Sequence, residues 1–388
     1  MPASVVFATS SAPFGISETW LQSEVSEIAR TRDVYLAPIL GRGEQQDWPN
    51  AKYLSNGSVF MYPKAILRLF RKPLRDVWKF DRTDEKFRSY LKNVLAALRG
   101  TVWGMKFRRE GISVRLVVAS FASGPAVAAV AMAQILDAKV SVIGHRFDIE
   151  MRAPKWVYRR VDLTRAISVS AQHEFLNRGI DSQVIPLGVV DELRPRDSAS
   201  KELSCVAIGQ LVPRKGHEQA IRAVAELQAE GIYCSLDIVG EGPLKDRLHE
   251  IIEDLGVGDR VRLRGPVQRV RLLEMLAVES WNILVHPSVV EGDLVEGIPA
   301  VILEAASRGL AVIASPSGGT SEYLVDGFNG LEIRGTNATE QIESLSLLIK
   351  RVAMESDLLE ALTSGGFQSL ERFTAASAVA TVFTTLEI

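Results

Sequence analysis

The chain has 388 residues, a length that excludes a single ordinary hydrophobic core and predicts two domains. Its 47% hydrophobic and 24% charged residues are typical of a soluble globular protein. The formal net charge is −2, but residues 1–200 carry 29 Lys and Arg against 20 Asp and Glu, and the remainder carries 16 against 27. The two halves therefore present different surfaces.

The chain starts with an apolar run, SVVFAT, which predicts a first strand that leads into a loop. The start lacks the basic residues of a secretory signal. Cys205 and Cys234 lie apart in apolar runs typical of core strands, where cysteine acts as a small buried hydrophobe. We therefore expect no targeting segment and a reducing, cytoplasmic compartment.

Residues 64–109 form a basic segment with 14 Lys and Arg against 4 Asp and Glu. Apolar residues alternate with cations there, in the pattern of a basic amphipathic helix. Such a helix favours contact with anionic lipid headgroups, here at the inner face of the membrane. The alternative is a solvated helix face that packs on its domain by its apolar side. No nucleic-acid motif accompanies the charge, so we expect no nucleic-acid partner.

Residues 116–136 contain no charged residue, which meets a crude criterion for a membrane span. The stretch nevertheless contains Ser120, Ser123, Gly124 and Pro125. We interpret it as a buried strand, a turn and an alanine-rich helix.

Short apolar runs alternate with helical periodicity from end to end, which predicts α/β domains with parallel sheets. A polar stretch, RPRDSASKE, interrupts the pattern after residue 193. We predict a Rossmann-like domain over residues 1–196, a second over 203–366, and a helix over 367–388 that returns to the first domain. Open α/β sheets bind ligands at the carboxyl ends of their strands, so we expect the active site in a cleft between two facing domains.

The loop GQLVPRKG, residues 209–216, follows a predicted strand and precedes a predicted helix. Arg214 and Lys215 there are suited to bind a diphosphate. The Lys ammonium provides a compact positive charge, and the Arg guanidinium can donate two parallel hydrogen bonds to phosphate oxygens. Two solvated loop cations are the alternative. The position at the carboxyl end of a strand favours phosphate.

Gly240 and Gly242, in VGEGPLK, form a fragment of a dinucleotide-binding fingerprint. The third glycine is missing, and no such loop follows the first strand of either domain. A nicotinamide dehydrogenase is therefore not expected.

His145 follows a predicted strand in SVIGHRFDIE. A lone histidine is more often a hydrogen-bonded structural residue than a catalyst. The other four histidines show no metal-ligand spacing, and no GxSxG motif or Cys/His pairing predicts a hydrolase. We expect a mechanism without a metal.

Glu296 and Glu304 lie in EGIPAVILEA with seven residues between them. Pro299 is suited to the first position of a helix, and Gly309 to its C-terminal end. Both carboxylates would then flank a ligand above the start of that helix, where free N–H groups favour phosphate.

The motifs GxLVxxKG, VGxGP, EGxPxxxLEA, GGxxE and DGxNG occur in this order in the second half. They resemble the family-4 retaining glycosyltransferases of the GT-B fold, and EGIPAVILEA resembles the colanic-acid and amylovoran type of exopolysaccharide transferase. SETW at residues 17–20 and HRFDI at residues 145–149 resemble the first domain of that group. The resemblance implies a nucleotide-sugar donor in the second domain and an acceptor in the first.

The resemblance also implies roles by position. Glu304 would bind the ribose, Glu296 a hydroxyl of the donor sugar, and His145 the sugar from its other side, near the anomeric carbon. The implied donor-binding residues are Gly15, Gln210, Arg214, Lys215, Val267, Glu296, Gly297, Ile298, Ala300, Val301 and Glu304. The implied catalytic residues are His145, Glu296 and Lys215. The implied acceptor-side residues are Ser17, Glu18 and Thr19.

These roles fit a same-face transfer in which the departing phosphate helps to deprotonate the acceptor hydroxyl. Cations and a helix N-terminus would stabilise the charge that develops on that phosphate. We expect a UDP- or GDP-sugar rather than an ADP-sugar, no other cofactor, and a saccharide acceptor linked to a lipid.

Two alternatives stay open. Gln210 stands where many relatives carry Arg, which favours a non-catalytic nucleotide-sugar-binding scaffold of a polysaccharide assembly complex. A GT-B-fold epimerase or phosphorylase is the second alternative.

Overall fold

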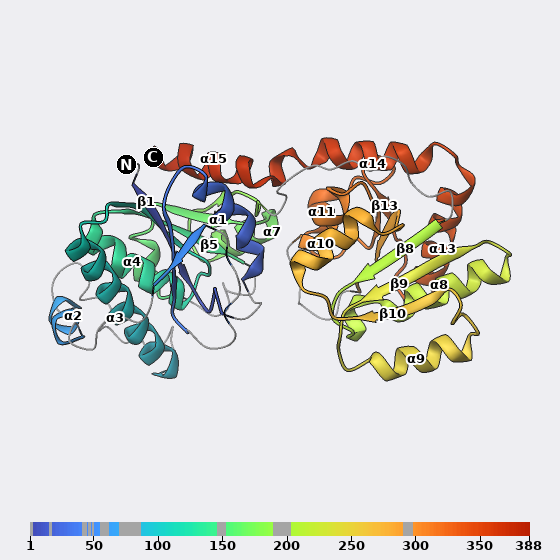
Figure 1. Ribbon diagram of the computed structural model, residues 1–388, viewed down its shortest axis with the longest axis horizontal. Helices are drawn as coiled ribbons and strands as arrows, with labels where there is room; N and C mark the ends of the chain where they lie inside the picture. Colours follow the sequence, from blue (N-terminus) through green and yellow to red (C-terminus); the bar gives the residue numbers. More distant parts are fainter. Residues whose placement is uncertain are drawn as a thin grey trace. The chain divides into compact units, whose positions relative to one another are not determined.

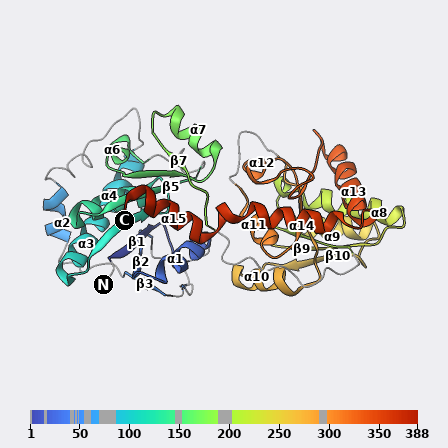
Figure 2. The same ribbon diagram turned by 90° about the horizontal axis from the view of Figure 1, so that it is seen from above.

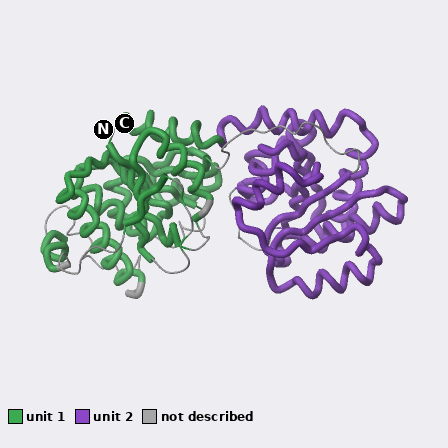
Figure 3. Tube along the Cα trace, viewed as in Figure 1, with its two compact units in different colours: residues 1–191, 374–388 green, residues 192–373 purple. Residues whose placement is uncertain are grey.

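The computed structural model describes residues 3–14, 18–40, 45, 48, 50–54, 62–69, 87–145, 153–188, 203–289 and 298–388. The chain divides into two compact units, shown in Figures 1 and 3. Unit 1 contains residues 1–191 and 374–388, and unit 2 contains residues 192–373. The unit boundaries at 191, 192 and 373 differ by 5, 11 and 7 residues from the predicted limits at 196, 203 and 366. The predicted linker over 194–202 lies outside the described residues.

Unit 1 is built on a seven-stranded sheet of order β3-β2-β1-β4-β5-β6-β7, in which each pair of neighbouring strands is parallel. Its strands are β1 (Ser4–Thr9), β2 (Val34–Pro38), β3 (Ala51–Tyr53), β4 (Val114–Ala119), β5 (Lys139–Gly144), β6 (Leu163–Ala166) and β7 (Gln183–Val184). Its helices are η1 (Thr19–Leu21), α1 (Gln22–Ala29), α2 (Tyr62–Leu69), α3 (Phe87–Glu110), α4 (Gly124–Leu136), α6 (Lys155–Tyr158), α7 (Val169–Asn177) and α15 (Ala375–Leu386).

Helices cover both faces of this sheet, which explains why its strands are continuous apolar runs. Successive residues of β1 point into different cores: Val6 packs with α3 and α4, and Phe7 packs with α1 and α15. Helix α15 lies beside α1, as Figure 2 shows from above. Val382 of α15 is buried there with Val25 of α1. The last helix of the chain is therefore part of the core of unit 1.

The uncharged stretch 116–136 forms β4 and α4, which confirms the prediction of a strand and a helix. Helix α4 is buried along most of its length. A Cβ at Gly100 of α3 would lie 2.1 Å from the carbonyl oxygen of Ala128, so the two helices pack at close range. Among the described helices, none has both the length and the apolar character needed to cross a bilayer.

Unit 2 is built on a six-stranded parallel sheet of order β10-β9-β8-β11-β12-β13. Cys205 and Cys234 are buried in adjacent strands of it, as predicted. The strands are β8 (Leu203–Ile208), β9 (Cys234–Val239), β10 (Val261–Gly265), β11 (Ile283–His286), β12 (Ala311–Ala314) and β13 (Leu331–Glu332). The helices are η4 (Pro213–Lys215), α8 (His217–Ala229), α9 (Lys245–Asp254), α10 (Arg269–Val278), α11 (Ala300–Ala306), α12 (Thr320–Tyr323), α13 (Ala338–Met354), α14 (Leu358–Ser369) and η5 (Glu371–Phe373).

The strand order reverses once in each sheet, between β1 and β4 in unit 1 and between β8 and β11 in unit 2. Loops that leave two such strands diverge to opposite sides and open a crevice at their carboxyl ends, where open α/β sheets bind ligands. The residues that follow these four strands are therefore the first place to look for a site.

Candidate functional site

The loop after β8 packs directly against the loop after β9. The backbone N–H of Leu211 donates to the carbonyl oxygen of Glu241 at 2.8 Å. A Cβ at Gly240 would lie 1.9 Å from the carbonyl oxygen of Gly209, and one at Gly242 would lie 2.6 Å from that of Leu211. Close backbone packing therefore accounts for the two glycines that resemble a dinucleotide fingerprint, because only glycine fits there.

Arg214 and Lys215 lie in η4, at the carboxyl end of β8. The η4 turn is held against the loop after β11, because the N–H of Val289 donates to the carbonyl oxygen of Arg214 at 2.9 Å. Burial, and after it the charge of Arg214, lowers the pKa of Lys215 from 10.5 to about 8. Two cations are thus brought together at the switch point of unit 2, where an anion would relieve their repulsion.

Two buried histidines stand beside these cations. The Nε2 of His217 lies 3.1 Å from the carbonyl oxygen of Gln210, and the Nε2 of His286 lies 3.0 Å from the Oγ of Ser288. Burial lowers the pKa of both, that of His286 to about 3, and the charge of Lys215 lowers both further. Both imidazoles are therefore neutral at pH 7 and add no positive charge of their own.

The spacing of His217 and His286 in the sequence gives no indication that the two side chains lie beside the same cations. His217 is the first residue of α8 and His286 the last of β11. A useful signal would have been their position, because each stands at the carboxyl end of a strand beside the switch point. Within the described part of the chain, no group of three or more His, Cys, Asp and Glu side chains is arranged to hold a metal ion.

Glu304 of α11 is buried and forms an ion pair with Arg269, the first residue of α10, with 2.8 Å between Oε1 and Nε. Sequence reasoning missed Arg269. Val267, predicted to contact the base, lies two residues before it, so the pair stands beside the predicted base-binding loop. Ile298, Ala300 and Val301 are half-buried at the start of α11; Glu296 and Gly297 lie outside the described residues.

A cavity of about 270 Å³ opens at the carboxyl ends of β11, β12 and β13. Ser288, the hydrogen-bond partner of His286, lines it together with Ser315, Glu332 and Arg334. The Oγ of Ser315 is buried and has no hydrogen-bond partner among the described residues. The cavity therefore adjoins the cationic loop and offers it polar groups.

At the corresponding edge of unit 1, His145 follows β5 and packs between two aromatic rings. Its ring centroid lies 4.6 Å from that of Trp20 and 5.1 Å from that of Phe121. Burial, and after it the charge of Arg165, lowers the pKa of His145 to about 4. Its Nε2 has no hydrogen-bond partner among the described residues. This nitrogen is buried and its hydrogen-bonding capacity is unsatisfied among the described residues, which is the feature that a ligand hydroxyl would use.

Glu18 organises the loop after β1. Its carboxylate accepts from the backbone N–H groups of Ser10, Ser11 and Ala12 at 2.7–2.8 Å and from the hydroxyl of Ser120. The structure therefore gives Glu18 a role in shaping the edge, and its contact with an acceptor stays a prediction. Gly15, Ser17 and the side chain of Thr19 lie outside the described residues.

A second buried carboxylate, Glu24 of α1, pairs with Arg165 of β6 through two contacts of 2.7 and 2.8 Å. Arg165 also donates to the carbonyl oxygens of Ile185 and Pro186, and Glu24 accepts from the N–H of Gly188. This pair fixes the segment that follows β7.

Comparison with known families identifies the second half of the chain. Residues 191–362 match the family model described as glycosyl transferases group 1. This part of the protein is a glycosyl transferases group 1 domain. The group 1 domain contains the β8 loop with Lys215, the two buried histidines and the pair of Glu304 with Arg269.

Two curated relatives resemble this domain and its surroundings. A GDP-mannose-dependent alpha-(1-6)-phosphatidylinositol monomannoside mannosyltransferase of Mycobacterium tuberculosis is 30% identical over 205 residues, covering 50% of this chain and 51% of the relative. The amylovoran biosynthesis glycosyltransferase AmsK of Erwinia amylovora is 28% identical over 211 residues, covering 51% and 52%. The chain thus spans about half the length of the curated relatives it matches. The resemblance to the amylovoran type is confirmed.

The fold extends over the whole chain. The crystal structure of Anabaena HepE in complex with UDP matches with a TM-score of 0.70 and 17% identity, and the match covers 99% of both chains. The fold is therefore GT-B, as predicted, with two α/β units that each contain a parallel sheet.

Proposed function

We propose that this protein is a glycosyltransferase that moves a sugar from a nucleotide-diphosphate sugar to a saccharide acceptor in polysaccharide biosynthesis. The observation that carries the proposal is the pair of cations, Arg214 and Lys215, at the switch point of a group 1 domain. The lowered pKa of Lys215 supports it, because a buried cation beside another cation is stabilised by an anionic ligand. Relatives named for GDP-mannose and for polysaccharide synthesis support a UDP- or GDP-sugar as donor.

In the proposed complex, Lys215 and Arg214 neutralise the diphosphate, and the backbone of Gln210 lies beside it. Glu304, held by Arg269, accepts hydrogen bonds from the ribose, and the backbone near Val267 contacts the base. Glu296 and the N–H groups at the start of α11 bind the donor sugar.

The proposed chemistry retains the configuration at the anomeric carbon and needs no metal. The bond between that carbon and the diphosphate oxygen breaks, and the acceptor oxygen forms its bond on the same face. The proton of the acceptor hydroxyl passes to the departing phosphate. His145 holds the donor sugar through Nε2 and does not transfer this proton, because its pKa of about 4 leaves it neutral and weakly basic.

We propose further that the acceptor is linked to a lipid and that the protein works in the cytoplasm at the inner face of the membrane. The surface of α2 and α3, which pack together, supports this (Figure 1). Leu67 of α2 is 68% exposed and Leu95 of α3 is 61% exposed, and cations such as Lys64 and Lys92 lie on the same helices. Arg71, Lys72 and Arg75 lie outside the described residues.

A donor screen tests the proposal. Calorimetric titration with UDP-, GDP- and ADP-sugars should show binding of one UDP- or GDP-sugar, and product analysis should show the sugar transferred or slowly hydrolysed. Glu304→Ala should weaken nucleotide binding, whereas His145→Ala should lower turnover with binding kept. Absence of binding to every nucleotide sugar would contradict the proposal, and binding without turnover would support the scaffold instead.

A further inference from the structure

Besides the cavity in unit 2, the protein has a cavity of about 640 Å³ in unit 1, at the amino ends of strands β6 and β7. It is lined by residues 161–164, where β6 begins, and by residues 178–184, which lead into β7. Because the sheet is parallel, this edge is opposite to the carboxyl edge that carries His145. The volume falls within the range of about 300–1,000 Å³ that is typical of small-molecule sites. The cavity is therefore large enough for a ligand and separate from the site described above.

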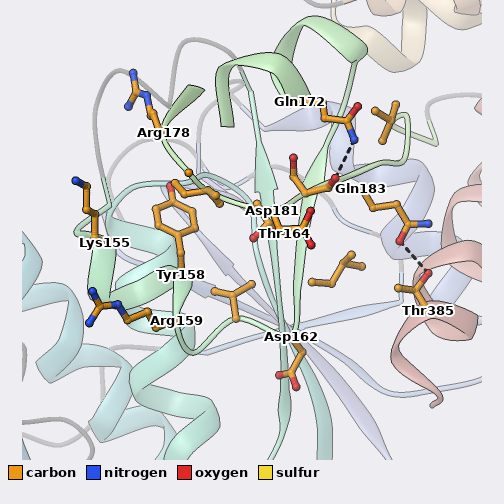
Figure 4. Close-up of a pocket in the computed structure, with 16 residues that line it drawn as sticks. Lys155, Tyr158, Arg159, Asp162, Thr164, Gln172, Arg178, Asp181, Gln183 and Thr385 are labelled. Atoms are coloured by element: carbon orange, nitrogen blue, oxygen red, sulfur yellow. Dashed lines mark hydrogen bonds between the residues drawn. The ribbon is translucent and has the colours of Figure 1, made fainter. Parts of the chain in front are cut away.

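Positive charge gathers on one wall of this cavity. Lys155 and Arg159 are exposed at either end of the short helix α6, and Arg178 follows α7. Figure 4 shows the three cations on the same side of the cavity. Arg178 is paired with Glu174 at 3.1 Å, but Arg159 makes no ion pair with any described residue. This wall is suited to an anionic group.

The opposite wall offers a different set of groups. Gln183 and Thr385 lie on the far side from the cations and provide an amide and a hydroxyl, and Asp181, labelled between the two groups, provides a carboxylate (Figure 4). The Oε1 of Gln183 accepts from the Oγ1 of Thr385 at 3.3 Å, so the amide N–H groups of Gln183 remain as donors. Such groups match the hydroxyls of a sugar, each of which both donates and accepts.

An aromatic ring lies on the side of the cations, because Tyr158 is the last residue of α6 (Figure 4). Tyr158 lines the cavity, and its ring packs edge to face on Phe175 with 6.0 Å between centroids. This packing fixes the orientation of the ring, and a fixed aromatic ring offers an apolar face to the C–H groups of a sugar.

We propose that this cavity is a second carbohydrate-binding site that takes an acidic oligosaccharide. The carboxylate of the ligand lies at Lys155 and Arg159, and a neutral sugar residue lies against Tyr158 and hydrogen-bonds to Asp181 and Gln183. The inference rests on the proposed function in one respect, because an enzyme that extends a polysaccharide meets the polymer as well as its reacting end. The site would hold a part of the polymer far from that end.

Calorimetric titration of the full chain without nucleotide tests this inference. The probes are a glucuronic-acid-containing disaccharide and cellobiose, a neutral disaccharide of the same size. We expect the acidic disaccharide to bind at least about tenfold more tightly than cellobiose. The double substitution Lys155→Gln and Arg159→Gln should weaken its binding at least about tenfold. The matched pair Lys106→Gln and Arg109→Gln, on α3 of the same unit, should leave it unchanged.

Three results would overturn the inference: no binding of the acidic disaccharide, equal binding of both probes, or equal losses in the two double variants. If the Tyr158→Ala variant folds, as checked by circular dichroism, and no longer binds the acidic disaccharide, the result would support the aromatic contact. Displacement of the disaccharide by equimolar inorganic sulfate would overturn the assignment to a saccharide. The Lys215→Ala variant separates the two proposals: it should keep disaccharide binding even where nucleotide-sugar binding is lost.

Discussion

The carboxyl edges of the two sheets use charged residues in different ways. In unit 1, Glu18 and Glu24 are satisfied inside the protein, the first by backbone N–H groups and the second by Arg165. In unit 2, Arg214 and Lys215 lie together beside histidines that burial keeps neutral. Unit 1 therefore uses its charges to build a rigid edge, whereas unit 2 places two cations side by side, which the proposed function assigns to the diphosphate of the donor.

The largest expected effect is on the stability of unit 1. Glu24→Ala removes one partner of a fully buried pair and leaves Arg165 without compensation, a change that costs about 3–5 kcal/mol. Native-state hydrogen exchange of the β6 amides measures it. The control is Glu27→Ala on the same helix, whose partner Arg30 is 65% exposed and whose ion pair contributes about 0–1 kcal/mol. Equal losses of stability in the Glu24→Ala and Glu27→Ala variants would show that the buried ion pair does not hold the edge of unit 1.

The next effect concerns the ligand of unit 2. Lys215→Ala removes a buried cation that would stabilise the leaving diphosphate, and we expect kcat/KM for the nucleotide sugar to fall about 10²–10³-fold, or roughly 2.7–4 kcal/mol. Steady-state kinetics with the donor found in the screen measures this. Lys350→Ala, a surface lysine of the same unit paired with Glu230, serves as the control. A change below about twofold would show that the cations of unit 2 have another purpose.

A smaller effect is expected for the edge of unit 1. His145→Ala should lower kcat about 10- to 100-fold, or roughly 1.4–2.7 kcal/mol, and leave the dissociation constant of the donor unchanged. The reason is that His145 offers one hydrogen bond from a neutral ring and no charge. Kinetics and calorimetry on the same variant separate the two quantities, and His173→Ala on the exposed side of α7 is the control. An equal loss of donor affinity would mean that unit 1 contributes to binding as well.

The smallest expected effect is a dependence of donor affinity on pH. The pKa of Lys215 is lowered to about 8, so this cation is protonated below pH 8 and loses its proton above it. A diphosphate binds the protonated form, so donor affinity should be nearly constant from about pH 6 to 7, fall to about half near pH 8, and fall about tenfold per pH unit above about pH 9. His217 and His286, whose pKa values burial lowers, are already neutral over this range. Lys215→Arg should flatten the profile; a slope that persists in this variant would assign the titration to another group.

The sequence predicts the fold well because each strand and helix carries a local pattern, and the restart of the pattern after residue 202 separates the two sheets. It also predicts that Arg214 and Lys215 follow a strand, because a loop after a strand is visible in the sequence; their contact with a diphosphate stays a prediction. It does not reveal Arg269, whose partner Glu304 lies 35 residues away and is brought near only by the packing of α10 on α11.

Two further motif residues, Asn329 and Glu18, make hydrogen bonds within the protein that the sequence does not show. In DGFNG, the side chain of Asn329 accepts from the N–H of Val325 at 2.6 Å and donates to the carbonyl oxygen of Tyr323 at 2.7 Å. That motif builds a turn. Glu18, predicted on the acceptor side by resemblance, has its carboxylate occupied by the loop after β1. Sequence order alone cannot show which polar group another part of the chain already satisfies.

The return of α15 to unit 1 makes unit 2 an insertion within unit 1. A ribosome therefore releases the apolar surface of α1 long before it releases Val382 and Leu386, which cover it. Synthesis of the 182 residues from 192 to 373 takes on the order of ten to forty seconds at about 5–20 residues per second. During that interval unit 1 exposes an uncovered helix, so unit 2 can complete its fold before the first part of the chain does.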